Sequence, residues 1–175
     1  NGSLSEDDML LALDTSTLTC GIALYDEPIV VGEMMWRTAN HHTVELAPAV
    51  SDLLRRCSVA PSDLKCVAVA LGPGSFTSLR ISLAFAKGLA FSLSIPIIGV
   101  TTFEYQAAAQ PVSDEPLFTI IPAGRTRMAI QEFRAMDGQW QPLDTPQVMT
   151  PEEISDRVSG PTRICGERNA SERQL

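Results

Sequence analysis

The sequence contains few residues of the kinds that most often form a reactive centre. Its 175 residues include two histidines and four cysteines, and only 19 % of them are charged. No CxxC pair is present, and no glycine is followed by the GK[ST] ending of a Walker motif. The wide spacing of the cysteines disfavours a disulfide scaffold or a zinc site. It predicts a reduced, intracellular protein. We further expect a cytoplasmic location and no cofactor.

The two histidines, His41 and His42, are adjacent in the sequence. Adjacent residues of a helix point about 100° apart, so this pair cannot share one helical face. His41 and Glu45 are four residues apart and could both contact a metal ion, but two ligands do not make a metal site. A capping or surface role is the preferred interpretation, and no Ser-His-Asp or Cys-His set is apparent.

The net charge of −8 disfavours direct binding to nucleic acid, because a phosphate backbone attracts a basic surface. No signal-peptide pattern is present, and the polar residues 1–8 are predicted to be a tag or a disordered tail. The most apolar window, residues 81–100, is interrupted by Lys87, Gly88 and Pro96. We therefore expect a buried helix followed by a strand there, and no membrane span.

Hydrophobic periodicity divides the first half of the chain into short strands and two helices. Three apolar runs joined by short links predict antiparallel strands, and the strand-helix-strand link after them suits a parallel crossover. The resulting order is that of a ribonuclease H-like fold. The predicted strands are residues 9–13, 20–25, 29–36, 65–71 and 96–100. The predicted helices are about Thr43–Cys57, with a kink at Pro48 or a start just before it, and Phe76–Leu93.

The second half of the chain restarts a strand-rich pattern, as expected for a duplicated, two-lobed fold. Residues 111–116 form a predicted linker, which places an N-terminal lobe at residues 9–110 and a C-terminal lobe at 111–175. The predicted elements are a helix at 103–110 capped by Thr101 or Thr102, strands at 117–121, 128–135, 140–143 and 163–165, and a helix that Thr150 caps and Pro151 starts.

A glycine-rich turn, Leu71-Gly72-Pro73-Gly74-Ser75, separates the fourth strand from the second helix. A helix N-terminus presents backbone N–H groups, so this turn could hold an anion. Asp14-Thr15-Ser16 ends the first strand, where phosphotransferases of the actin and sugar-kinase type place an acid near a metal-bound phosphate. The alternative is that the glycines only reverse the chain and that the Asp-Ser turn satisfies its own backbone. The predicted phosphate-like loop, interpreted as vestigial, comprises Asp14, Thr15, Ser16, Gly72, Gly74 and Ser75.

The second predicted helix has little polar surface, and a helix that is apolar nearly all round must be buried on both sides. In so small a chain the second side is buried either by the core or by a partner. Apolar residues of the first helix also recur at spacings of three or four. The predicted partner interface comprises Val44, Ala47, Val50, Leu54, Leu79, Ala84, Phe85, Lys87 and Gly88.

Five segments in order resemble the bacterial TsaB (YeaZ) family. They are Leu11–Thr17, His42–Pro48, Leu71–Leu79, Ala86–Ala90 and Ile95–Val100. The resemblance is continuous from about Met9 to Gln110, and a weaker match follows through Thr150–Glu153 and Cys165–Glu167. It implies an actin-like ATPase fold in which two lobes of mixed sheets are flanked by helices.

The resemblance also implies a function. Members of this family act in the complex that makes N6-threonylcarbamoyladenosine at position 37 of tRNA, where the partner TsaD carries the chemistry and the ATPase TsaE is a third member. The chain is therefore expected to be a non-catalytic scaffold subunit. Its expected partners are a TsaD-like subunit, a TsaE-like ATPase and a second copy of itself when alone, with tRNA reached only through the complex and no membrane.

Three departures from the family and its catalytic relatives qualify this expectation. The catalytic relatives carry two metal-binding histidines just after the strand that matches Ile97–Val100. The matching positions here are Thr102 and Gln106, neither of which is a good transition-metal ligand. Pro122–Arg125 replaces an Asp-Ala-Arg type motif, and the chain ends at Leu175 where members continue, as expected of a fragment or a short variant.

Two alternative functions stay open from the residues. An actin-like-fold ATPase or kinase would use Asp14 and the turn from Gly72 to Ser75 to hold phosphate. A metallopeptidase of the M22 type would need a set of metal ligands. Binding of Mg-ATP by the isolated chain would favour the first, and stoichiometric zinc or iron would favour the second.

Overall fold

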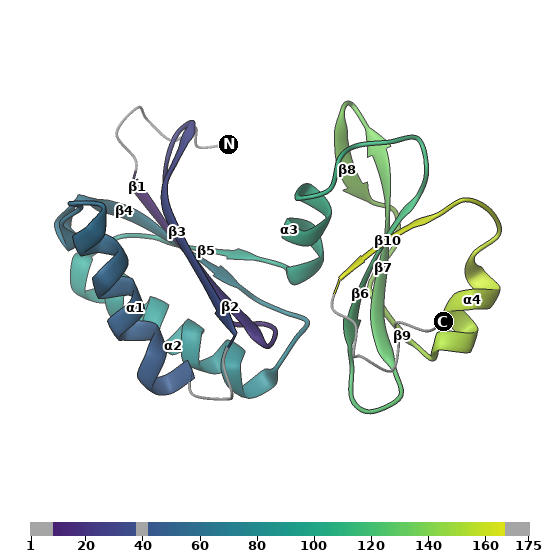
Figure 1. Ribbon diagram of the computed structural model, residues 1–175, viewed down its shortest axis with the longest axis horizontal. Coiled ribbons are helices and arrows are strands. Elements are labelled where there is room, and N and C mark those ends of the chain that lie inside the picture. The colour runs from purple at the N-terminus through teal and green to yellow at the C-terminus, as the bar shows by residue number, and fades with distance from the viewer. Residues whose placement is uncertain (1–8, 38–41, 167–175) are drawn as a thin grey trace. The chain divides into compact units, whose positions relative to one another are not determined.

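The computed structural model describes residues 9–37 and 42–166, apart from the side chains of His42 and Thr43. The predicted tail at 1–8 lies outside the described residues, as does His41, for which a capping or surface role was preferred. Glu167, the last residue of the weaker family match, also lies outside them. The chain forms two compact units, which we call the first lobe and the second lobe (Figure 1).

The boundary between the lobes lies between Val100 and Thr101, and not after Gln110 as the sequence predicted. The segment in question is helix α3 (Thr102–Ala108). Its side chains Phe103 and Ala107 are buried in a core cluster of the second lobe. Periodicity marks the apolar face of a helix but not the core that the face joins, so only the tertiary structure could place this helix.

A five-stranded mixed sheet in the order β3-β2-β1-β4-β5 forms the first lobe. β2 pairs antiparallel with both β1 and β3, whereas β4 runs parallel to both β1 and β5. This is the predicted ribonuclease H-like arrangement. The strands are β1 (Met9–Asp14), β2 (Thr19–Asp26), β3 (Ile29–Arg37), β4 (Leu64–Ala70) and β5 (Ile97–Val100).

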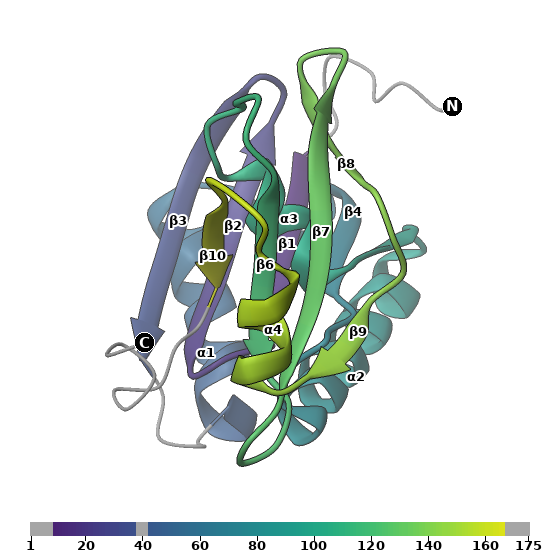
Figure 2. The same ribbon diagram turned by 90° about the vertical axis from the view of Figure 1, so that its right-hand side faces the viewer.

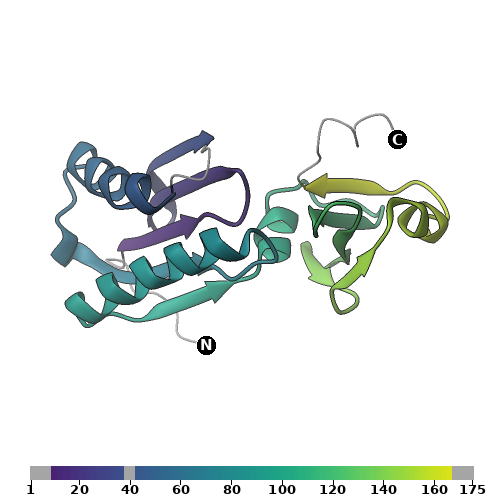
Figure 3. The ribbon, with the colours of Figure 1, turned by 90° about the horizontal axis from the view of Figure 1, so that it is seen from below.

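Helices α1 (His42–Arg56) and α2 (Phe76–Leu93) pack on the sheet of the first lobe (Figures 1 and 3). Leu11 of β1 is completely buried in one cluster with Leu46 of α1 and Ala86 of α2, so both helices cover the same face. Of the two predicted outcomes at Pro48, a start just before it is wrong, because α1 begins at His42 and continues through the proline.

Helix α2 contacts the sheet through small side chains. Its buried residues are Ser78, Ser82, Ala86 and Ala90, which follow one another at intervals of four and therefore share a face. Phe76 and Phe91 are 73 % and 88 % exposed. Of the two predicted ways to bury the second side of this helix, burial by the core is therefore wrong, because small residues form the buried face and large apolar ones lie outside. Burial by a partner stays a prediction.

By length and composition alone, α2 is also apolar enough to cross a membrane, a test that core helices of globular proteins pass as well. It ends at Leu93, and the chain turns at Ser94, whose left-handed backbone caps the helix. The strand β5 follows directly. A helix and then a strand is what the interrupted window at residues 81–100 predicted.

The second lobe is a sheet in the order β10-β6-β7-β8, with β9 also paired to β7. Phe103 of α3 packs on one face of this sheet and Ile154 of α4 packs on the other. Figure 2 shows α4 lying across the front of the strands. The elements are α3, β6 (Leu117–Pro122), β7 (Met128–Met136), β8 (Gln139–Pro142), β9 (Gln147–Met149), α4 (Pro151–Arg157) and β10 (Arg163–Gly166).

The two lobes repeat one topology. β8, β7, β6 and β10 are joined by antiparallel, antiparallel and parallel pairings, in the same order as β3, β2, β1 and β4. A pair of such lobes is the actin-like arrangement expected from the sequence. The sequence did not predict the strand β9, because three residues are too short to show a period.

Candidate functional site

Most of the residues singled out in the sequence lie in two features of the first lobe. The first is a pair of polar turns, one after β1 and one between β4 and α2. The second is the surface of α1 and α2 that faces away from the sheet. The turns decide whether the lobe keeps a phosphate site.

The two turns are in direct contact. The backbone N–H of Ser75 donates a hydrogen bond of 2.7 Å to the carbonyl oxygen of Ser16. Gly74 lies so close to that carbonyl that a Cβ atom would collide with it, which explains a glycine at this position. Gly72 has a φ of +95°, the left-handed region that favours glycine. The structure thus brings together the turns that the sequence placed 56 or more positions apart: residues 14–16 and residues 72–75.

The hydroxyl groups of the turns bond to protein groups. Thr15 is completely buried, and its Oγ1 lies 2.8 Å from the carbonyl oxygen of Ser78 and 2.9 Å from Oγ of Ser82. Ser75 caps α2, because its Oγ accepts hydrogen bonds from the N–H and the hydroxyl of Ser78. Ser16 is 1 % exposed, and its N–H donates to Oδ1 of Asp14 over 2.8 Å. These groups therefore hold the turns and α2 together.

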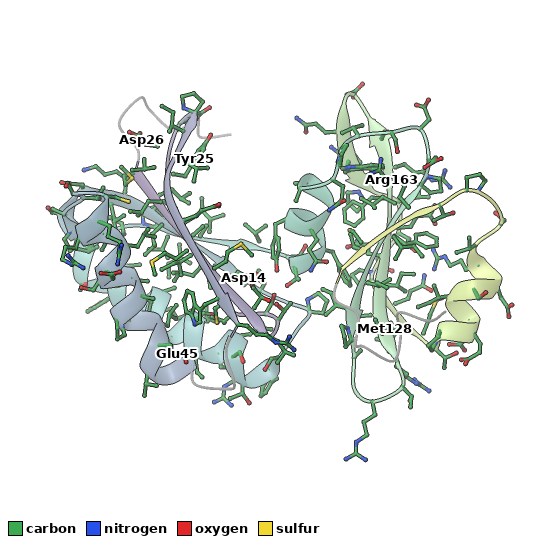
Figure 4. All side chains as sticks on the ribbon, viewed as in Figure 1. Asp14, Tyr25, Asp26, Glu45, Met128 and Arg163 are labelled. Atoms are coloured by element: carbon green, nitrogen blue, oxygen red, sulfur yellow. The ribbon has the colours of Figure 1, made fainter. Side chains whose placement is uncertain are left out.

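Carboxylates of the first lobe lie near a buried thiol. Cys20 is completely buried on β2, and burial raises its pKa to about 11, with smaller contributions from the charges of Glu45 and Asp14. Glu45 also accepts a 3.0 Å hydrogen bond from Nε1 of Trp36. Figure 4 labels Glu45 on α1 and Asp14 at the end of β1. A thiol with a raised pKa stays protonated near neutral pH, so Cys20 is a poor nucleophile.

Within residues 9–37 and 42–166, no three His, Cys, Asp or Glu residues are grouped in a way that could hold a metal ion. Thr102 and Gln106 lie one turn apart on α3. The Thr102 hydroxyl and the Gln106 side-chain oxygen are buried and have no hydrogen-bond partner among the described groups. Pro122 is the last residue of β6, and Ala123 to Arg125 begin the turn after it, the position that the turn after β1 holds in the first lobe.

The predicted interface residues divide into two groups. Val44 is 70 % exposed, and Ala47, Ala84, Lys87 and Gly88 are exposed as well, while Leu79 and Phe85 are half-buried. Val50 and Leu54 are buried in the core that α1 shares with the sheet. A spacing of three or four residues identifies a helix face but does not say whether it points inward, so these two residues belong to the core face.

The exposed part of the two helices contains a groove of about 750 Å³. Leu46 and Ala47 of α1 line one wall, and residues of α2 from Thr77 to Lys87 line the other. Arg80 belongs to this lining and was missed in the sequence, as were Ser78 and Ser82, which fix Thr15. The signal that could have found them is the four-residue spacing of small residues, which marks the inward face of α2 and so places Arg80 outside.

Comparisons with known proteins find similarity to a TsaD family model and to curated relatives named TsaB, both of threonylcarbamoyladenosine synthesis. The family model described as TsaD, tRNA N6-adenosine threonylcarbamoyltransferase, matches residues 36–171. The tRNA threonylcarbamoyladenosine biosynthesis protein TsaB of Bacillus subtilis is 48 % identical over 99 residues, which are 57 % of this chain and 43 % of the relative. The protein of the same name from Escherichia coli is 31 % identical over 152 residues, which are 85 % of this chain and 65 % of the relative.

A solved structure extends this likeness to the fold. It is the crystal structure of an uncharacterized Pseudomonas aeruginosa protein with similarity to peptidase YEAZ. It is 30 % identical to this chain, with a TM-score of 0.77, and the match covers 91 % of this chain and 74 % of that one. The chain thus spans less than two thirds of the two curated relatives and about three quarters of the solved structure.

Proposed function

The chain belongs to the TsaB (YeaZ) family, and from this premise we propose that it is the non-catalytic scaffold and dimerisation subunit of the complex that forms N6-threonylcarbamoyladenosine at position 37 of tRNA. Its proposed partners are a TsaD-like catalytic subunit and a TsaE-like ATPase, with a second copy of the chain as partner when it is alone. We place this activity in the cytoplasm.

The observation that carries the proposal is the exposed apolar surface of α1 and α2. Val44 and Ala84 lie on it, and Phe76 and Phe91 extend it along α2 with large exposed rings. Exposed apolar side chains that gather on one surface are typical of a protein interface, and aromatic residues are enriched there. A scaffold subunit needs such a surface, whereas a self-sufficient enzyme of this size does not.

The polar turns support a non-catalytic role. The hydroxyl of Thr15 and the N–H of Ser75, both of which could bind phosphate, form hydrogen bonds within the lobe. Phosphate binding would require these bonds to be exchanged, at a cost comparable to the affinity that they would provide. We therefore interpret the two turns as a vestigial phosphate loop whose hydrogen bonds now hold α2 in place. Micromolar binding of Mg-ATP by the isolated chain would contradict this interpretation and favour a kinase or ATPase.

The net charge of −8 supports an indirect route to tRNA. An acidic chain is repelled by phosphates unless a basic partner supplies the contacts. In the proposed complex the TsaD-like subunit binds the tRNA, and this chain contributes by holding that subunit. The isolated chain is accordingly expected to bind tRNA far more weakly than the complex does.

The test is a substitution in the middle of the exposed surface. Ala84→Arg places a long charged side chain on the outer face of α2 without entering the core, so the fold should persist while binding of the TsaD-like subunit is lost. Ala108→Arg makes the same change at an exposed alanine of α3 and serves as the control. Co-elution on size-exclusion chromatography is the measurement. Retention of the complex by the Ala84→Arg variant would count against the proposal.

A further inference from the structure

The charged side chains that line the groove between α1 and α2 are both positive. Helix α2 has two charged residues, Arg80 and Lys87, and no acid along its 18 residues. Both cations are exposed, and both line the groove between the helices. The chain as a whole carries a net charge of −8, so a cationic patch on this surface runs against its overall composition.

Neither cation is neutralised by an acid in the part of the lobe that the structure describes. Among residues 9–37 and 42–166, Arg80 and Lys87 form no ion pair. The Arg80 guanidinium instead lies over the ring of Phe76, 5.3 Å from its centre. The acids of α1 are otherwise engaged, since Asp52 pairs with Arg55 and Arg56 on its own helix and Glu45 accepts from Trp36. The surface therefore presents positive charge on an apolar background.

The two cations lie on the same side of the exposed stripe. At 100° per residue, Arg80 and Lys87 project about 40° and 60° to one side of Ala84, roughly 6 Å and 4.5 Å from it along the helix axis. A twofold axis that packs α2 antiparallel against its copy at Ala84 would bring Arg80 of each chain opposite Lys87 of the other. In a parallel pairing the twofold axis runs along the helices, so the two copies of Arg80 would lie at the same height but on opposite flanks of the contact. Antiparallel self-association through α2 thus sets like charges against each other.

We propose that Arg80 and Lys87 are specificity residues, which select a partner helix that carries carboxylates on an apolar face and weaken pairing with a second copy of this chain. Like charges across an interface disfavour the wrong partner, and opposite charges favour the right one. The identity of the preferred partner, the TsaD-like subunit, rests on the proposed function. The chemistry of the partner surface, acidic and apolar, follows from the charges of this one.

The test is the charge reversal Lys87→Glu, because it should move the two associations in opposite directions. In the antiparallel pairing Arg80 now opposes Glu at position 87 of the copy, so self-association measured by sedimentation equilibrium should tighten at least about fivefold. Binding of the TsaD-like subunit of the same organism, measured by calorimetry, should weaken by a similar factor. Both changes should shrink between about 50 mM and about 500 mM salt, because exposed charges are screened.

The matched control is Lys65→Glu, which makes the same charge change at an exposed residue of β4 outside the groove. It should leave both associations near their wild-type values. Self-association that is unchanged or weaker in Lys87→Glu than in this control would overturn the inference. So would unchanged binding of the TsaD-like subunit. If the wild-type chain binds no TsaD-like subunit, the proposed function fails, and the sedimentation experiment still decides whether the cations oppose self-association.

Discussion

Thr15 and Ser82 lie 67 positions apart in the sequence, yet their hydroxyl oxygens are 2.9 Å apart in a completely buried site. This contact joins the turn after β1 to the inward face of α2. The helix that carries the exposed surface is therefore held by the turn that first suggested a phosphate site.

Replacement of Thr15 by valine should loosen α2 without leaving a cavity, since the two side chains have nearly the same shape. The Ser78 carbonyl and the Ser82 hydroxyl lose a buried partner, so the free energy of unfolding should fall by about 1–3 kcal/mol. Urea unfolding is the measurement. Thr77→Val, the same change at an exposed position of α2, is the control and should alter stability by less than about 0.5 kcal/mol. Equal stability of the two variants would contradict the role assigned to Thr15.

Two glycines near α2 should respond to alanine in opposite ways. A Cβ at Gly74 would collide with the Ser16 carbonyl, so Gly74→Ala should destabilise the chain by about 1–3 kcal/mol. Gly88 lies in the helix with no atom within 4 Å of a Cβ, so Gly88→Ala should stabilise it by about 0.5–1 kcal/mol. Thermal unfolding of both variants is the measurement. Destabilisation of similar size at both positions would contradict the close contact of the two turns.

Stability should depend on the ionisation of Cys20 at alkaline pH. Its folded pKa of about 11 lies above the ordinary value of 9.0, so the protonated thiol is favoured in the folded state. This contribution is complete below pH 9 and is lost as the pH rises toward 11, by up to about 1.4 kcal/mol per pH unit. Unfolding of the wild type and of Cys20→Ala across this pH range is the measurement. The loss should be shallower in the variant, and parallel curves would exclude the effect.

The sequence predicted the strand order of the first lobe because the lengths of the links between apolar runs restrict how strands can pair. It also predicted the cap of α4 at Thr150 and named Thr101 as one of two candidates for the cap of α3, because capping depends on neighbouring residues only. Both threonines accept a hydrogen bond from the third residue of their helix. The lobe to which α3 belongs, and the existence of β9, depended on contacts with distant segments. Local patterns do not contain that information.

At the candidate site the same division holds. The residue types and spacing of Asp14–Ser16 and of Gly72–Ser75 were enough to single out both turns, since glycine at a close contact and hydroxyls at a helix start have local causes. Only the tertiary structure decided that the Thr15 hydroxyl and the Ser75 N–H bond to protein groups, that Val50 and Leu54 point into the core, and that Arg80 lines the outer groove. The physical reason is that sequence fixes which residues share a helix face, whereas packing against the sheet fixes which face is turned inward.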